Sequence, residues 1–164
     1  HYRLIDPFCL FYLKYVSGKN VVDTNFWTNN QQSQSVVSWR GIAFEDLCIR
    51  HMSQIKSALG ISGVITSQSN WIVPGNEDEP GMQIDLLINR NDNVVNMCEM
   101  KFYNEDFAVS GEYYKKIASR VNKIHEELPK KYAVHSTLIT TYGLAYNEYS
   151  GAFQQVITLE NLFS

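Results

Sequence analysis

The fold is decided by one stretch, MQIDLLINRNDNVVNMCEMKFY at residues 82–103. Two apolar segments, residues 82–89 and 94–103, flank a short polar segment that is rich in asparagine. Apolar segments bounded by such polar residues are typical of two strands joined by a tight turn. The stretch is therefore predicted to form a β-hairpin whose turn is residues 91–93.

This hairpin carries two carboxylates and a lysine. A turn at residues 91–93 places Leu86 opposite Cys98 and Asp85 opposite Glu99. Lys101 lies on the same face as Glu99, because residues two apart in a strand point the same way. Like charges directly opposite each other destabilise a strand pair, and a divalent cation between them removes the repulsion.

We therefore expect Asp85 and Glu99 to bind Mg²⁺ or Mn²⁺ together with waters and phosphate oxygens. Lys101 is expected to orient or deprotonate a water, or to neutralise charge that develops on a phosphate.

The segments around the hairpin predict an α/β protein. A helix is expected at residues 39–59, where apolar residues recur at spacings of three and four, with Ser38 as its cap and Gly60 at its end. Glu45 lies on the apolar side of this helix, where a carboxylate needs a partner. The other predicted elements are strands at 64–73, 132–142 and 155–159 and a helix at 110–128. The predicted order is α-β-β-β-α-β-β.

Residues 1–38 differ in character from the rest of the chain. Asp6 followed by Pro7 is a good helix start, since Asp caps the helix and Pro suits its first position. Residues 17–38 are rich in Asn, Gln and Ser, which indicates a linker with a short helix near residues 25–34. We expect a helical extension and linker at residues 1–38 and a second domain at residues 39–164.

Composition restricts the function classes. The chain has 164 residues, of which 45% are hydrophobic, and its net charge of −3 argues against a dedicated high-affinity nucleic-acid binder. The three cysteines form no C-x-x-C pair, which argues against a zinc knuckle or a disulfide framework. Reduced thiols indicate a cytoplasmic protein. No apolar run approaches the roughly 18 residues that a membrane span needs.

The helix at residues 110–128 carries a basic stripe. Lys116, Arg120 and Lys123 follow one another at helical spacing. They form either a solvated helix face or an edge that follows nucleic-acid phosphates. Tyr113 either stacks on bases or packs in the core.

The motif residues resemble those of the PD-(D/E)XK nuclease superfamily. The resemblance lies in GMQIDLLI at residues 81–88, CEMK at 98–101 and a preceding helix with Gly-x-x-Phe-Glu. It implies a restriction-endonuclease-like core, α-β-β-β-α-β, with a central mixed sheet flanked by helices. It also implies metal-dependent hydrolysis of phosphodiester bonds in nucleic acid, with DNA favoured. Asp85 and Glu99 match the metal ligands and Lys101 the catalytic lysine. Glu45 matches an additional helix acid that supports a metal or the attacking water. Ile84 stands where the family name has proline.

A narrower resemblance is to the C-terminal nuclease-like domain of prokaryotic archaeal-type AAA+ ATPases. It rests on Tyr-x-Leu-x-Asp-Pro-Phe at residues 2–8 and implies an ATPase region upstream in the same polypeptide. A nuclease-like module that no longer cuts, and serves interaction or regulation, is the alternative function. A winged-helix DNA-binding module is disfavoured, because the half with the motif is rich in strands. Homo-oligomerisation is left open.

Overall fold

The computed structural model describes residues 6–18, 24–75 and 81–164. It divides the chain into two compact units, residues 1–50 and 51–164. The division falls later than the expected boundary after residue 38. Residues 2–5, part of the phrase that resembles the ATPase family, lie outside the described residues.

In the described residues, the first unit contains helices α1 (Pro7–Tyr15), α2 (Phe26–Asn30) and α3 (Gln34–Arg50). The helix start at Asp6 is confirmed, since the backbone N–H of Cys9 donates to Asp6 Oδ2 at 2.9 Å. Aromatic rings from the three helices pack edge to face, as Trp27 does against Phe11 and Trp39. No helix in the described part of the chain is long and apolar enough to cross a membrane.

The single helix predicted at residues 39–59 is wrong. Helix α3 begins earlier, and a second helix, α4 (Met52–Ala58), follows it. His51 separates the two because its backbone angles, φ −101° and ψ 32°, leave the helical region. Gly60 ends α4 as predicted. It has φ +69°, and its N–H donates to the Ser57 carbonyl oxygen, the pattern of a glycine-terminated helix.

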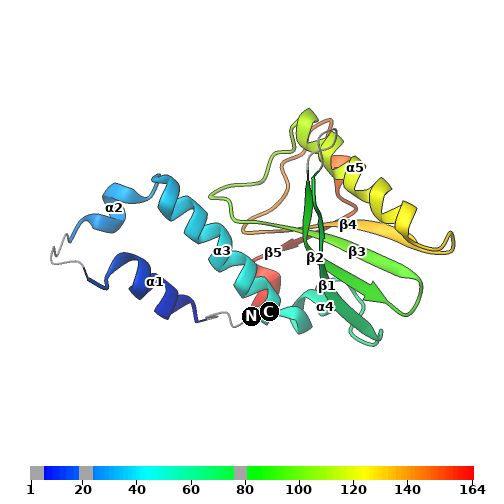
Figure 1. Cartoon of the computed structure of the whole chain (residues 1–164), viewed down its shortest axis with the longest axis horizontal. Coiled ribbons are helices and arrows are strands. Elements are labelled where there is room, and N and C mark those ends of the chain that lie inside the picture. Colours follow the sequence, from blue (N-terminus) through cyan, green and yellow to red (C-terminus); the bar gives the residue numbers. More distant parts are fainter. Residues whose placement is uncertain (1–5, 19–23, 76–80) are drawn as a thin grey trace. The chain divides into compact units, whose positions relative to one another are not determined.

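The second unit is built on an open five-stranded mixed sheet (Figure 1). Its strands lie in chain order and are β1 (Thr66–Val73), β2 (Met82–Arg90), β3 (Val94–Lys101), β4 (Ala133–Thr140) and β5 (Gln155–Thr158). The first two neighbouring pairs are antiparallel and the last two are parallel. Helix α5 (Gly111–Glu127) connects β3 to β4, and short 3-10 helices η1 (Ser150–Ala152) and η2 (Glu160–Leu162) flank β5. The predicted α/β class with a mixed sheet and a short N-terminal helix is confirmed.

The hairpin register agrees with the prediction. Leu86 pairs with Cys98, and Asn93 takes a positive φ of 64°, as the last residue of a three-residue hairpin turn often does. The regular pairs of β2 and β3 end at Leu86 and Cys98, so Asp85 lies one residue beyond them. Strand β1 also changes register against β2 between Ser69 and Trp71. Asp85 therefore lies at a local irregularity of the sheet, a feature common beside functional sites.

Helix α5 covers one face of the sheet (Figure 1). Ile117 and Ile124 of the helix are buried in one apolar cluster with Val95 and Met97 of β3 and Leu138 of β4. Alternation along β3 places Glu99 in the same row as Val95 and Met97. The strand therefore directs the Glu99 carboxylate toward α5.

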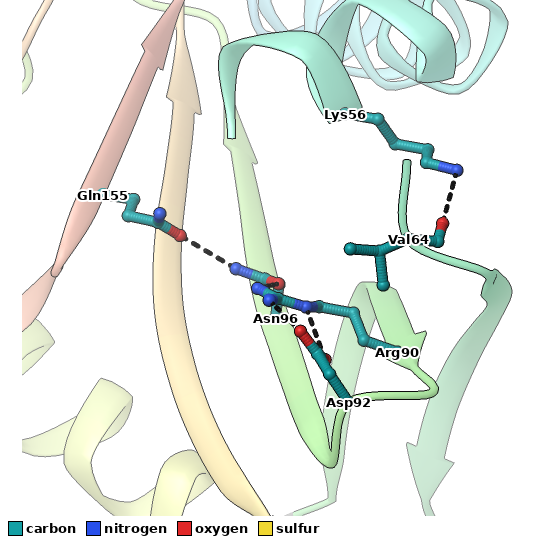
Figure 2. Close-up of polar contacts among 6 residues, drawn as sticks. All are labelled: Lys56, Val64, Arg90, Asp92, Asn96 and Gln155. Atoms are coloured by element: carbon teal, nitrogen blue, oxygen red, sulfur yellow. Dashed lines mark hydrogen bonds and ion pairs between the residues drawn. The ribbon is translucent and has the colours of Figure 1, made fainter. Parts of the chain in front are cut away.

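The opposite face of β3 carries a buried polar network (Figure 2). Asn96 is fully buried, and its Nδ2 donates to Gln155 Oε1 at 2.9 Å and to Thr137 Oγ1 at 3.2 Å. Arg90 bonds both Asn96 Oδ1 and the Asp92 carboxylate of the hairpin turn. These bonds join β3, β4 and β5 to the turn and help to fix the register on which the position of Glu99 depends.

Candidate carboxylate site

Glu99 is the centre of the site. Its side chain is 1% exposed, and three neighbouring side chains act on its carboxylate. Arg120 Nη1 donates to Oε1. The Tyr113 hydroxyl donates to Oε2 at 2.8 Å, and Lys101 Nζ lies 3.7 Å from the same oxygen. A buried carboxylate needs such partners, and these three neighbours hold the Glu99 side chain in place.

The local sequence explains how α5 supplies two of these partners. Ser110 caps the helix, because its hydroxyl accepts a hydrogen bond from the backbone N–H of Tyr113. Tyr113, Ile117, Arg120 and Ile124 follow at spacings of four, three and four, which is one face of a helix. That face packs on the sheet through the two isoleucines. Tyr113 and Arg120 are therefore directed at the sheet with them.

Burial also affects Tyr113 itself. Desolvation raises the pKa of its hydroxyl, and the charge and hydrogen bond of Glu99 raise it further. The hydroxyl therefore remains protonated throughout the neutral range and acts as a donor to Glu99.

Asp85 is the second carboxylate of the site. Burial raises the pKa of its carboxyl, and the negative charge on Glu99 adds to that rise. Lys101, Arg120 and a hydrogen bond from Gln83 Nε2, at 3.3 Å from Asp85 Oδ1, act in the opposite direction. The structure thus brings Asp85, Glu99 and Lys101 into one electrostatic site.

The raised pKa of Asp85 predicts a pH-dependent effect of Asp85→Asn. A carboxyl whose pKa is higher in the folded state favours folding below its unfolded pKa, and this contribution is lost as pH rises through the folded pKa. We expect Asp85→Asn to be more stable than the natural protein at neutral pH, and this advantage to shrink as pH falls toward about 4. Urea unfolding of both proteins across this range measures the difference. An advantage that does not change with pH would contradict the assignment.

Glu45 is the fourth candidate residue. It belongs to α3 in the first unit, whereas the other three candidates belong to the second. Its membership of the site therefore stays a prediction. Within α3 its charge adds to the effect of burial, which raises the pKa of the Cys48 thiol to about 12. Cys48 is thus an unreactive buried thiol at neutral pH.

The basic stripe on α5 is divided by the structure. Lys116 is exposed and Lys123 lies 3.4 Å from Glu126, but Arg120 is buried and paired with Glu99. The expectation of a solvated helix face is therefore wrong for Arg120, and its part in a phosphate-following edge stays a prediction. Its position between Ile117 and Ile124 on the apolar face was the signal that could have identified it. Tyr113 was expected in the core or on bases, and its bond to Glu99 was not anticipated.

The residues present fit a divalent cation in part. Asp85 and Glu99 are hard oxygen ligands, and Mg²⁺ needs only one or two carboxylates. Arg120 and Lys101 both pair with Glu99, so positive charge is already favoured beside this carboxylate. Among the residues that the structure describes, no three His, Cys, Asp or Glu side chains converge on one point. A cation at Glu99 must therefore share the carboxylate with Arg120 or displace it.

No protein-family profile and no curated protein matches the chain. A solved structure described as a protein of unknown function, AF1548, is similar at a TM-score of 0.46 and 19% identity. The match covers 71% of this chain and 64% of that one, so the chain spans less than two thirds of the length of this neighbour.

Proposed function

We propose that the second unit hydrolyses phosphodiester bonds in nucleic acid, DNA being favoured, with Mg²⁺ or Mn²⁺ at Asp85 and Glu99. The observation that carries the proposal is the end of the hairpin, where Asp85 and Glu99 lie next to the Leu86–Cys98 pair on adjacent strands and Lys101 Nζ lies 3.7 Å from Glu99. Such a set on adjacent strands is what the resemblance to PD-(D/E)XK nucleases implies. The narrower resemblance to archaeal-type AAA+ ATPases extends the proposal to an ATPase region in the same polypeptide, and the cysteine pattern extends it to a cytoplasmic protein.

The roles of the residues follow from their burial and charge. A bound divalent cation supplies Lewis-acid polarisation of the phosphate. Asp85 and Glu99 provide the negative charge that would hold it, and Glu45 is the proposed additional acid. Lys101 is suited to act on water or on the phosphate, because its side chain is 34% exposed while its Nζ lies against Glu99.

A second candidate function is a nuclease-like module that binds nucleic acid or protein without cutting. The observation in its favour is the ion pair between Arg120 and Glu99, which neutralises the central carboxylate from within the protein. Metal binding distinguishes the two candidates, because only the first requires it.

The test is calorimetric titration of the protein with MgCl₂ and MnCl₂, followed by an assay with fluorescent DNA and RNA substrates. We expect a binding signal at millimolar metal that is lost in Glu99→Ala and Glu99→Gln. Glu148→Ala is the matched control, because Glu148 is an exposed carboxylate in the loop before η1. It should bind metal like the natural protein.

The absence of a signal at millimolar metal, with the protein folded by circular dichroism, would rule out the metal-dependent enzyme and leave the second candidate. A signal that persists unchanged in both Glu99 variants would show that the ion binds elsewhere, and would equally rule out the proposed site.

A further inference from the structure

A hollow of about 980 Å³ runs along α5 beside β1 and β2. Its basic side chains are Lys115, Lys116, Arg120 and Lys123, all from the middle of the helix. Two carboxylates, Glu112 and Glu126, also line it, but they come from the first and last turns of α5. Among the residues that the structure describes, the middle of the hollow is therefore positive, although the whole chain has a net charge of −3.

Arg120 belongs both to this hollow and to the carboxylate site. It lines the hollow, is 8% exposed, and gives Nη1 to Glu99. Its Nε is buried and has no hydrogen-bond partner in the described part of the chain. A guanidinium has five N–H donors in a planar fork and suits a phosphate as well as a carboxylate. Arg120 thus has donors beyond the one that Glu99 uses.

We propose that this hollow binds a backbone phosphate of nucleic acid and that Arg120 is shared between that phosphate and Glu99. The inference rests on the proposed function for its substrate class and adds a phosphate subsite with a defined link to the carboxylates. Exposed lysines attract the polyanion, and the buried arginine gives the more directional contact.

Sharing has a measurable consequence. A guanidinium bonded to Glu99 is less available to a phosphate, so loss of the Glu99 charge frees Arg120 and tightens the binding of nucleic acid. Removal of any nearby negative charge also strengthens the binding of a polyanion, because it removes a repulsion. Asp85→Asn measures that general effect, because Asp85 interacts with Arg120 by charge while its carboxylate accepts a hydrogen bond from Gln83.

The experiment measures fluorescence anisotropy of a labelled DNA oligonucleotide with the full chain in the presence of a chelator, so that hydrolysis plays no part. We expect Lys116→Ala to weaken binding several-fold and Arg120→Lys to weaken it about tenfold or more, since lysine lacks the fork. Lys131→Ala, an exposed lysine outside the hollow, should bind normally. The Glu99→Gln variant should bind the oligonucleotide more tightly than the Asp85→Asn variant does. Adding Arg120→Lys to Glu99→Gln should abolish this additional gain in affinity. Thermal unfolding by circular dichroism confirms that each variant is folded.

Normal binding by both Lys116→Ala and Arg120→Lys would overturn the phosphate subsite. Equal gains in Glu99→Gln and Asp85→Asn would overturn the sharing of Arg120. Competition by polyglutamate as effective as that by unlabelled DNA would show that the occupant is an acidic peptide, against the proposal. Hydrolysis with magnesium is measured separately. Binding without hydrolysis contradicts only the proposed function, and hydrolysis without binding in the hollow contradicts only this inference.

Discussion

Arg120→Met is expected to lower the free energy of unfolding by about 3–5 kcal/mol at neutral pH, as measured by urea denaturation. The reason is that Glu99 is 1% exposed and would keep its charge in a buried position without its main counter-ion. Tyr113 and Lys101 remain, but one is neutral and the other lies 3.7 Å from Glu99. Removal of one member of a buried ion pair costs more than the pair itself contributes.

The double variant Glu99→Gln/Arg120→Met distinguishes an unpaired charge from simple loss of packing. Its unfolding free energy should recover most of the loss, because no buried charge is left without a partner. Lys123→Met is the matched control. It removes a cation of the same helix that is paired with the exposed Glu126, and should change stability by less than about 1 kcal/mol. If Arg120→Met lowers the free energy of unfolding by no more than Lys123→Met does, burial of the Glu99 carboxylate does not depend on Arg120.

The elements of the second unit could be predicted because local signals agree there. The hairpin register follows from turn length alone, and Leu86 does pair with Cys98. The helix at residues 110–128 was predicted almost to its ends because Ser110 caps it and Pro129 follows it. The break at His51 was not predictable, because apolar residues keep helical spacing through it, with Cys48, Met52 and Ile55 all buried.

The site was predictable only where it lies within the hairpin. Asp85, Glu99 and Lys101 are placed by strand alternation and by a short turn, which the sequence displays directly. Arg120 and Tyr113 reach Glu99 from α5, through a contact between residues 21 positions apart for the arginine. No spacing rule predicts such a contact. Only the apolar residues on either side of Arg120 indicated that it faces inward, and they do not identify its partner.

Lys101→Met is expected to reduce hydrolysis of nucleic acid about 10²–10⁴-fold, the usual contribution of a positioned acid–base or charge-stabilising group. Lys101 is the one proposed catalytic side chain that combines contact with Glu99 and access to solvent, with 34% of its side chain exposed. Because it is not buried, its loss should leave the unfolding free energy nearly unchanged. The effect should therefore appear in kcat, while metal binding by calorimetry stays within a few-fold of the natural protein.

Lys131→Met is the matched control for Lys101→Met, since it removes an exposed lysine whose Nζ lies over the Tyr132 ring in the segment before β4. It should retain the natural rate. A lysine that acts on the reacting phosphate or water lowers kcat, whereas one that only attracts the polyanion raises KM and loses its effect at high salt. A kcat for Lys101→Met equal to that of Lys131→Met would remove Lys101 from the chemistry. The chemistry would then rest on Asp85, Glu99 and the cation that they would hold.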